Sequence, residues 1–131
     1  SLYRKYQNDA KFGFIYYNPN PSLAAKAAEA STKQNLFWDM HTVLFNMHAS
    51  GVVINDTSAI MNAASKINLD KKKLLTDIES DEIYDKMHYN FEILQRSGIH
   101  EYPIIIINNH IFKAPFSETE LDSYIHQLIY N

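Results

Sequence analysis

At 131 residues the chain has the length of one domain, enough to bury roughly two-thirds of its unfolded surface, and it leaves no room for a second domain. A formal charge of −3 and 46% hydrophobic residues are typical of an ordinary globular protein and give no long-range attraction to nucleic acid or an anionic membrane. The absence of cysteine excludes disulfides, thiolate metal sites and thiol nucleophiles within these residues.

The sequence predicts neither a membrane span nor an export signal. No apolar run approaches the roughly 20 residues that cross a bilayer. Residues Ser1 to Lys5 lack the pattern of a signal peptide, so if the protein is exported we expect its signal to have been removed already.

The beginning of the chain predicts the end of a helix followed by a strand. Residues Leu2 to Asn8 have a helical pattern without a capping residue before them, so we expect this helix to start upstream of Ser1. Residues Lys11 to Tyr17 are aromatic and β-branched, and Asn18-Pro19-Asn20-Pro21 follows them. This pattern favours a strand that ends in a turn.

A block of helices is predicted next, with Ser22, Asp70 and Ser80 as caps and Gly51 and Gly98 as stops. The predicted helices run from Leu23 to Ala30, Leu36 to Ala49, about Ser58 to Ser65, Asp70 to Ile78, and Ser80 to Gly98. Helical spacing predicts two buried stripes, formed by Phe37, Met40, Leu44 and Met47 and by Ile83, Met87, Phe91 and Leu94.

A proline marks the change from helices to strands. Pro103 suits the start of a strand because it cannot donate a ladder hydrogen bond, and Ile104 to Ile107 predict a strand covered on both faces. Asn108-Asn109 has the chemistry of a two-residue hairpin turn before a second strand, His110 to Lys113. Ser117 and Glu120 fit a capping box, which opens a last helix that buries Leu121, Tyr124, Ile125 and Leu128.

The order of these elements favours an α/β fold with a right-handed parallel crossover. With its proline-led hairpin after the helical block, it resembles the thioredoxin fold in its DsbA-like form. The stretches that carry the resemblance are the alanine-rich Leu23–Ala30, the phenylalanine-tryptophan helix Leu36–Phe45, the approach to the cis-proline loop, Leu94–Pro103, and the hairpin Ile106–Asn109. The resemblance implies a single DsbA-like domain over residues 1–131, incomplete at its N-terminus, with a helical insertion at about 22–98.

The sequence departs from the family pattern in two places. Tyr102 and Glu101 stand where the family usually has a small or β-branched residue and a glycine. The first strand and the helix with Cys-x-x-Cys would precede Ser1, so the family's redox centre has no residue here to be carried onto. In a thioredoxin-like sheet, the missing strand lies between Lys11–Tyr17 and Ile104–Ile107.

Without that strand, both of its neighbours would have unpaired backbone groups, each costing roughly 1–3 kcal/mol when buried. Several such groups would exceed the few kcal/mol by which a domain is stable. We therefore expect one of three solutions. Residues upstream of Ser1 complete the sheet, another segment or a second copy supplies the strand, or the sheet is rearranged.

The resemblance implies a substrate-binding site at Glu101, Tyr102 and Pro103. Pro103 would be cis, and the backbone at Tyr102 would dock extended or partly folded polypeptides by strand addition. A packed core tyrosine and a trans proline that only starts a strand are the structural alternatives.

No metal or cofactor site is predicted. His41 and His48 lie two turns apart on one helix and are interpreted as packing or surface residues, while His100 could tune a neighbouring thiolate by its charge. Phe37, Trp38 and Phe45 are interpreted as core residues. Lys71-Lys72-Lys73 is interpreted as a solvated face and not a nucleic-acid site.

Two functions remain open. The first is a DsbA-like thiol-disulfide oxidoreductase of the periplasm or another exported compartment, whose cysteine pair lies outside this chain. The second is a redox-inactive peptide-binding or structural module, favoured by the lack of cysteine and by Tyr102 in place of a small residue.

Overall fold

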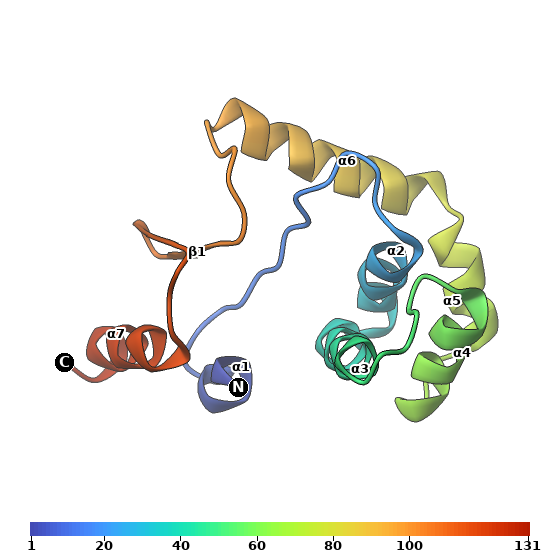
Figure 1. The fold of residues 1–131 in the computed structure, drawn as a ribbon, viewed down its shortest axis with the longest axis horizontal. Coiled ribbons are helices and arrows are strands. Elements are labelled where there is room, and N and C mark those ends of the chain that lie inside the picture. The colour runs from blue at the N-terminus through green and yellow to red at the C-terminus, as the bar shows by residue number, and fades with distance from the viewer. The chain divides into compact units, whose positions relative to one another are not determined.

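Helices dominate the computed structural model, which describes all of residues 1–131 (Figure 1). The elements are α1 (Leu2–Tyr6), α2 (Leu23–Ala30), the 3₁₀ helix η1 (Ser31–Gln34), α3 (Phe37–Ala49), α4 (Thr57–Lys66), α5 (Lys71–Ile78), α6 (Asp81–Arg96), β1 (Ile104–Ile107), β2 (His110–Lys113) and α7 (Glu118–Tyr130). The chain forms two compact units, Tyr16–Leu94 and the pair of segments Ser1–Ile15 and Gln95–Asn131. The predicted single domain with an insertion at about 22–98 stays a prediction.

Polar side chains start the helices of the Tyr16–Leu94 unit. Ser22 Oγ accepts a hydrogen bond from the Ala25 amide at 3.2 Å, which begins α2 as predicted. Asp70 Oδ1 accepts a hydrogen bond from the Lys73 amide at 2.9 Å, which begins α5. The cap of α4 is Asp56, so this helix begins one residue earlier than predicted.

Residues with a positive φ end these helices. Gly51 has a φ of 84°, and the Val52 amide donates to the Met47 carbonyl at 3.0 Å, closing α3. Gly98 has a φ of 76° directly after α6. Both glycines were predicted as stops, because only glycine adopts this conformation at little cost.

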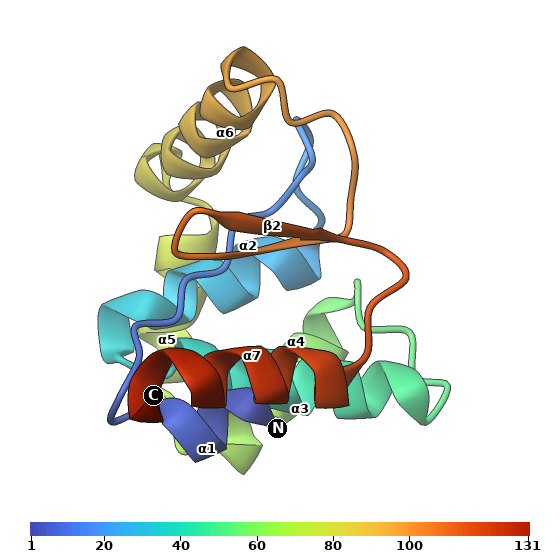
Figure 2. The same ribbon diagram turned by 90° about the vertical axis from the view of Figure 1, so that its left-hand side faces the viewer.

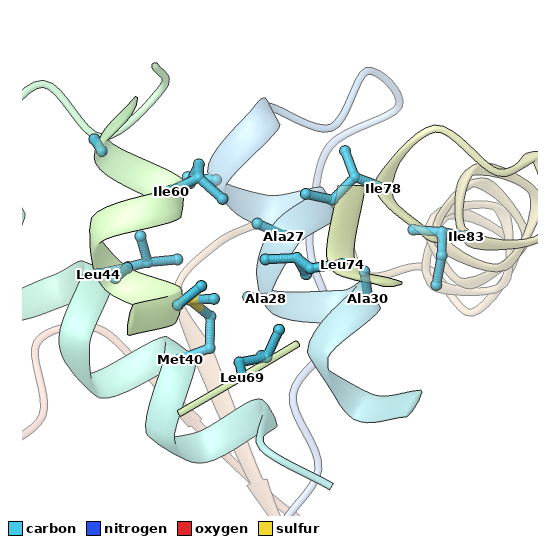
Figure 3. Packing of buried hydrophobic residues seen from close by; sticks show 14 of the residues in the cluster. Ala27, Ala28, Ala30, Met40, Leu44, Ile60, Leu69, Leu74, Ile78 and Ile83 are labelled. Atoms are coloured by element: carbon cyan, nitrogen blue, oxygen red, sulfur yellow. The ribbon is translucent and has the colours of Figure 1, made fainter. Parts of the chain in front are cut away.

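The core of this unit consists of helices packed on the small side chains of α2 (Figure 3). Alanine lets two backbones approach closely, and the larger side chains of α3 to α6 fill the space around it. The residues that meet there include Ala27, Ala28, Ala30, Met40, Leu44, Ile60, Leu69, Leu74, Ile78 and Ile83. Of the two predicted stripes, Met40, Leu44, Met47, Ile83 and Met87 are buried, while Phe37, Phe91 and Leu94 are partly exposed.

Two carboxylates lie inside this unit and are paired with lysines from other turns or helices. Glu29 on α2 forms an ion pair with Lys86 on α6. Asp77 on α5 lies 2.7 Å from Lys73 Nζ and 3.4 Å from Lys33 Nζ. A buried charge is tolerated only with such partners, so these pairs restrict how α2, α5 and α6 can pack.

The other unit contains the hairpin and the two terminal helices. Strands β1 and β2 pair antiparallel from Ile104↔Lys113 to Ile107↔His110, with Asn108 at a φ of 53° in the turn, as predicted. Ser117 accepts a hydrogen bond from the Glu120 amide at 3.1 Å and begins α7. The hairpin lies over one side of α7, and α1 lies against another (Figure 2).

The predicted strand Lys11–Tyr17 is wrong, because these residues run without any strand pairing (Figure 1). The sheet has two strands in total, and Lys11–Tyr17 is hydrogen-bonded to neither of them as a strand. For the same reason the isoleucine strand is not covered on both faces: none of its residues is buried, and Ile106 is exposed.

Two further burial predictions are wrong. Leu128 is exposed near the end of α7, whereas Leu121 and Ile125 are buried. Phe45 is exposed on α3 and is not a core residue, whereas Phe37 is partly buried and packs against the core, and Trp38 is partly buried. Helical spacing predicts which residues share a face, but not how far the neighbouring element extends over that face.

The packing of this core can be tested by mutating two neighbouring leucines on α5. Leu74 is 0% exposed, whereas Leu75 is 41% exposed. We expect Leu74→Ala to lower the free energy of unfolding by about 2–5 kcal/mol, because it leaves a cavity. Leu75→Ala is the matched control and should change the value by only about 0.5 kcal/mol. Urea unfolding of both variants measures the difference, and equal effects would contradict the packing.

Candidate functional site

The loop between α6 and β1 contains the predicted site. After Gly98 the chain leaves the helix, and the His100 ring lies 3.1 Å from Gln95 Oε1, which fixes the first part of the loop. Glu101, Tyr102 and Pro103 follow, and all three are exposed. Tyr102 is 72% exposed, so the alternative of a packed core tyrosine is wrong.

The Tyr102-Pro103 peptide bond is cis, which confirms the prediction. Strand β1 begins with the next residue, Ile104. A second cis bond, Ala114-Pro115, directly follows β2. Sequence reasoning missed it, although its position just after a strand was the available signal.

The base of the hairpin has one charged pair. Lys113 Nζ donates a hydrogen bond to Glu101 Oε1 at 3.2 Å, and the pairing of Ile104 with Lys113 explains why the two side chains meet. Both are exposed, and an exposed pair of this kind stabilises by only about 0–1 kcal/mol. The Glu101 carboxylate is thus oriented by Lys113 but can exchange it for another partner.

The hairpin is attached to α7 through aromatic rings. Phe112 is buried, and its ring centroid lies 5.1 Å from that of Tyr124 on α7. His110 lies 4.6 Å from Phe112 and 5.2 Å from Tyr124, measured between ring centroids. This cluster holds β2, the partner of the strand that follows the candidate loop.

A buried tyrosine attaches α1 to the same helix. Tyr6 is buried and donates a hydrogen bond to Asp122 Oδ1 at 2.7 Å. Lys5 Nζ contacts both carboxylate oxygens, at 2.7 and 2.8 Å. The sequence pattern gave no signal for this contact, because Lys5 and Asp122 lie at opposite ends of the chain.

The structure shows no cluster of three or more histidine or acidic side chains that could hold a metal ion. His41 is partly buried among Phe37, Trp38 and Phe45, with ring centroids 4.4 Å apart for the pair with Phe45. Burial lowers the pKa of His41. The predicted effect of His100 on a thiolate stays a prediction, since the chain has no cysteine.

The comparisons with known proteins identify the family. The family model described as thioredoxin matches residues 1–127. The chain therefore belongs to the thioredoxin family, in its DsbA-like form, and its 131 residues contain no redox-active cysteine pair.

One curated relative is the Na(+)/H(+) antiporter NhaA of Herminiimonas arsenicoxydans, 21% identical over 101 residues. The match covers 76% of this chain but only 16% of the antiporter. No solved structure matches the chain. None of the helices described here has the length and apolar character of a membrane span.

The pH dependence of stability tests the contact between α1 and α7. Lys5, followed by Tyr6, holds the pKa of Asp122 below its ordinary value. Because the folded-state pKa is the lower one, the stabilisation is present above the unfolded value of about 3.9 and is lost as the pH falls through the folded value.

Asp122→Asn should therefore lower the melting temperature at pH 7, and the gap to the unmodified protein should close as the pH falls below about 4. Thermal unfolding followed by circular dichroism between pH 2 and pH 7 measures this gap. Asp9→Asn, at an exposed carboxylate in the same unit, is the control. A gap that is equally large at pH 2 would argue against the charged contact.

Proposed function

We propose that this chain docks extended or partly folded polypeptides through Glu101, Tyr102 and Pro103, as part of a DsbA-like thiol-disulfide oxidoreductase of the periplasm or another exported compartment. In such a protein a thiolate at a helix start attacks a substrate disulfide, forms a mixed disulfide and releases a substrate thiolate. The cysteines would come from residues outside these 131. This chain contributes the docking loop and the helical unit.

The exposed approach to β1 is the observation that carries this proposal. Glu101, Tyr102 and Pro103 are exposed immediately before a strand that pairs on one edge only, with β2. An extended peptide can pair its main chain with the backbone at Tyr102, ahead of β1, while neighbouring side chains select its residues. Tyr102 offers an exposed aromatic contact, the residue type that often dominates binding energy.

The fold proposed for the whole protein is a thioredoxin-like α/β sheet with the helical insertion at about 22–98. Its first strand and the start of its active-site helix would be supplied from outside this sequence. The assignment of Lys11–Tyr17 supports this proposal, since these residues are in no β-strand although they have the composition of one. A second copy of the chain is the other possible source of the missing strand.

The absence of cysteine favours a second candidate, a redox-inactive peptide-binding or structural module. In this alternative the docking loop is kept and the exchange chemistry is lost. An oxidative refolding assay on the full-length gene product separates the two. Turnover excludes the module, and a full-length sequence without Cys-x-x-Cys excludes the oxidoreductase.

Peptide docking can be tested with a carboxymethylated, permanently unfolded protein as the probe. We expect Tyr102→Ala to weaken its binding to the full-length product about tenfold, because an aromatic contact is removed. Tyr130→Ala is the matched control, since Tyr130 is 57% exposed on α7 of the same unit. Fluorescence anisotropy of the labelled probe measures the affinities. Unchanged binding by Tyr102→Ala, or equal losses in both variants, would overturn the assignment.

A further inference from the structure

A hollow lies wholly within the Tyr16–Leu94 unit, distant in sequence from residues 101–103. Its volume is about 260 Å³, and it is bordered by the segment before α2, by α2 itself, by α3 and by Ile54. Tyr16 and Tyr17 line it from the first of these, Ala25 and Ala28 from α2, and Phe45 from α3. This hollow is called the α2–α3 groove below.

The α2–α3 groove carries no formal charge at neutral pH. None of its lining residues is an aspartate, glutamate, lysine or arginine. His41 and the two tyrosines are its titratable groups. Burial lowers the pKa of His41 and raises that of Tyr16, so both stay neutral. The Glu29 carboxylate, which also raises the pKa of Tyr16, is already paired with Lys86. A charged ligand would therefore lose its hydration in the groove without gaining an unpaired opposite charge.

The groove is lined by aromatic rings and small side chains. Phe45 is 61% exposed, and its ring is tilted by 34° against that of His41. Ala25 and Ala28 leave space beside these rings because their side chains end at Cβ. An aromatic ligand could contact ring faces and edges and would bury the exposed Phe45, a combination that stabilises beyond burial alone.

The size and the polar residues of the groove indicate what kind of molecule would carry the aromatic ring of the ligand. A volume of about 260 Å³ lies below the range of roughly 300–1,000 Å³ for drug-sized ligands. Asn18 and Ser22 also line the groove. The oxygen of each side chain accepts a local amide, from Asn20 and Ala25 respectively. The Asn18 amide nitrogen and the Ser22 hydroxyl hydrogen remain as donors for a main-chain carbonyl.

We propose that the α2–α3 groove binds one uncharged aromatic side chain of a partner polypeptide, with Asn18 and Ser22 donating to the adjacent main chain. The proposal does not depend on docking at Tyr102. It adds a site that selects by side-chain chemistry.

N-acetyl-L-phenylalaninamide is the probe, because it combines an uncharged ring with main-chain carbonyl groups. Titrated into the ¹⁵N-labelled full chain, it should produce saturable amide shifts that centre on Ala25, Ala28 and Phe45. N-acetyl-L-leucinamide should bind about fivefold more weakly, since it lacks a ring, and N-acetyl-L-lysinamide should not saturate. Equal binding of all three, or shifts that centre elsewhere, would overturn the proposal.

Two pairs of variants locate the binding. Phe45→Ala should weaken it about fivefold or more, while Tyr89→Ala, at a tyrosine 60% exposed on α6, should not. Ala25→Leu should block the groove, while Ala49→Leu, at the exposed end of α3, should leave binding intact. Phe45 is exposed, so its variant keeps the test decisive even if Ala25→Leu disturbs the fold. Undiminished binding by Phe45→Ala would exclude the groove. Tyr102→Ala should bind the probe normally, which distinguishes this site from the docking loop.

Discussion

A segment becomes a β-strand only where another backbone lies beside it to share its hydrogen bonds, and this chain meets that condition once, between β1 and β2. The rest of the architecture depends on this limit. A sheet of two strands cannot bury a large apolar surface, so the helices α2 to α6 form the main core. Lys11–Tyr17, although strand-like in composition, is not part of a strand.

The same limit explains how the candidate loop is held. An isolated two-stranded hairpin is marginally stable at best in water. Here β2 gains support from Phe112, which packs on Tyr124 of α7, and α7 is in turn bound to α1 through Tyr6 and Asp122. Residues 101–103 therefore lead directly into β1, and the side-chain contacts of its partner β2 set the position of the hairpin. The edge of β1 that faces away from β2 has no paired strand.

Local chemistry made much of this structure predictable from the sequence. Caps such as Ser22 and Asp70, stops such as Gly51 and the turn at Asn108 act within a few residues, so the sequence around them is sufficient. The exposure of Phe45 and Leu128 and the absence of a strand at Lys11–Tyr17 depend on what lies beside these residues in space, and helical or strand periodicity does not contain that information.

The two candidate sites also differ in how far they could be predicted from the sequence. The family resemblance predicted the cis bond before Pro103 in the candidate loop, because a proline between a helix and a strand is visible in the sequence. The α2–α3 groove could not be predicted, since its residues come from four separate segments and are individually ordinary core or turn residues. Phe45 is exposed on α3, whereas Met40, Leu44 and Met47 on the same helix are buried, and helical spacing alone does not distinguish them.

A buried ion pair restricts the movement of α2, the helix that forms one side of the α2–α3 groove. Ala25 and Ala28 belong to the same short helix as Glu29, which is buried and paired with Lys86 of α6. Sliding or rotating α2 would separate this pair and leave a carboxylate uncompensated in the core, which is costlier than losing an exposed contact. The alanines that line the groove are thus fixed before any ligand arrives. Binding to a preorganised surface loses less conformational entropy, so even a small groove can select one side chain.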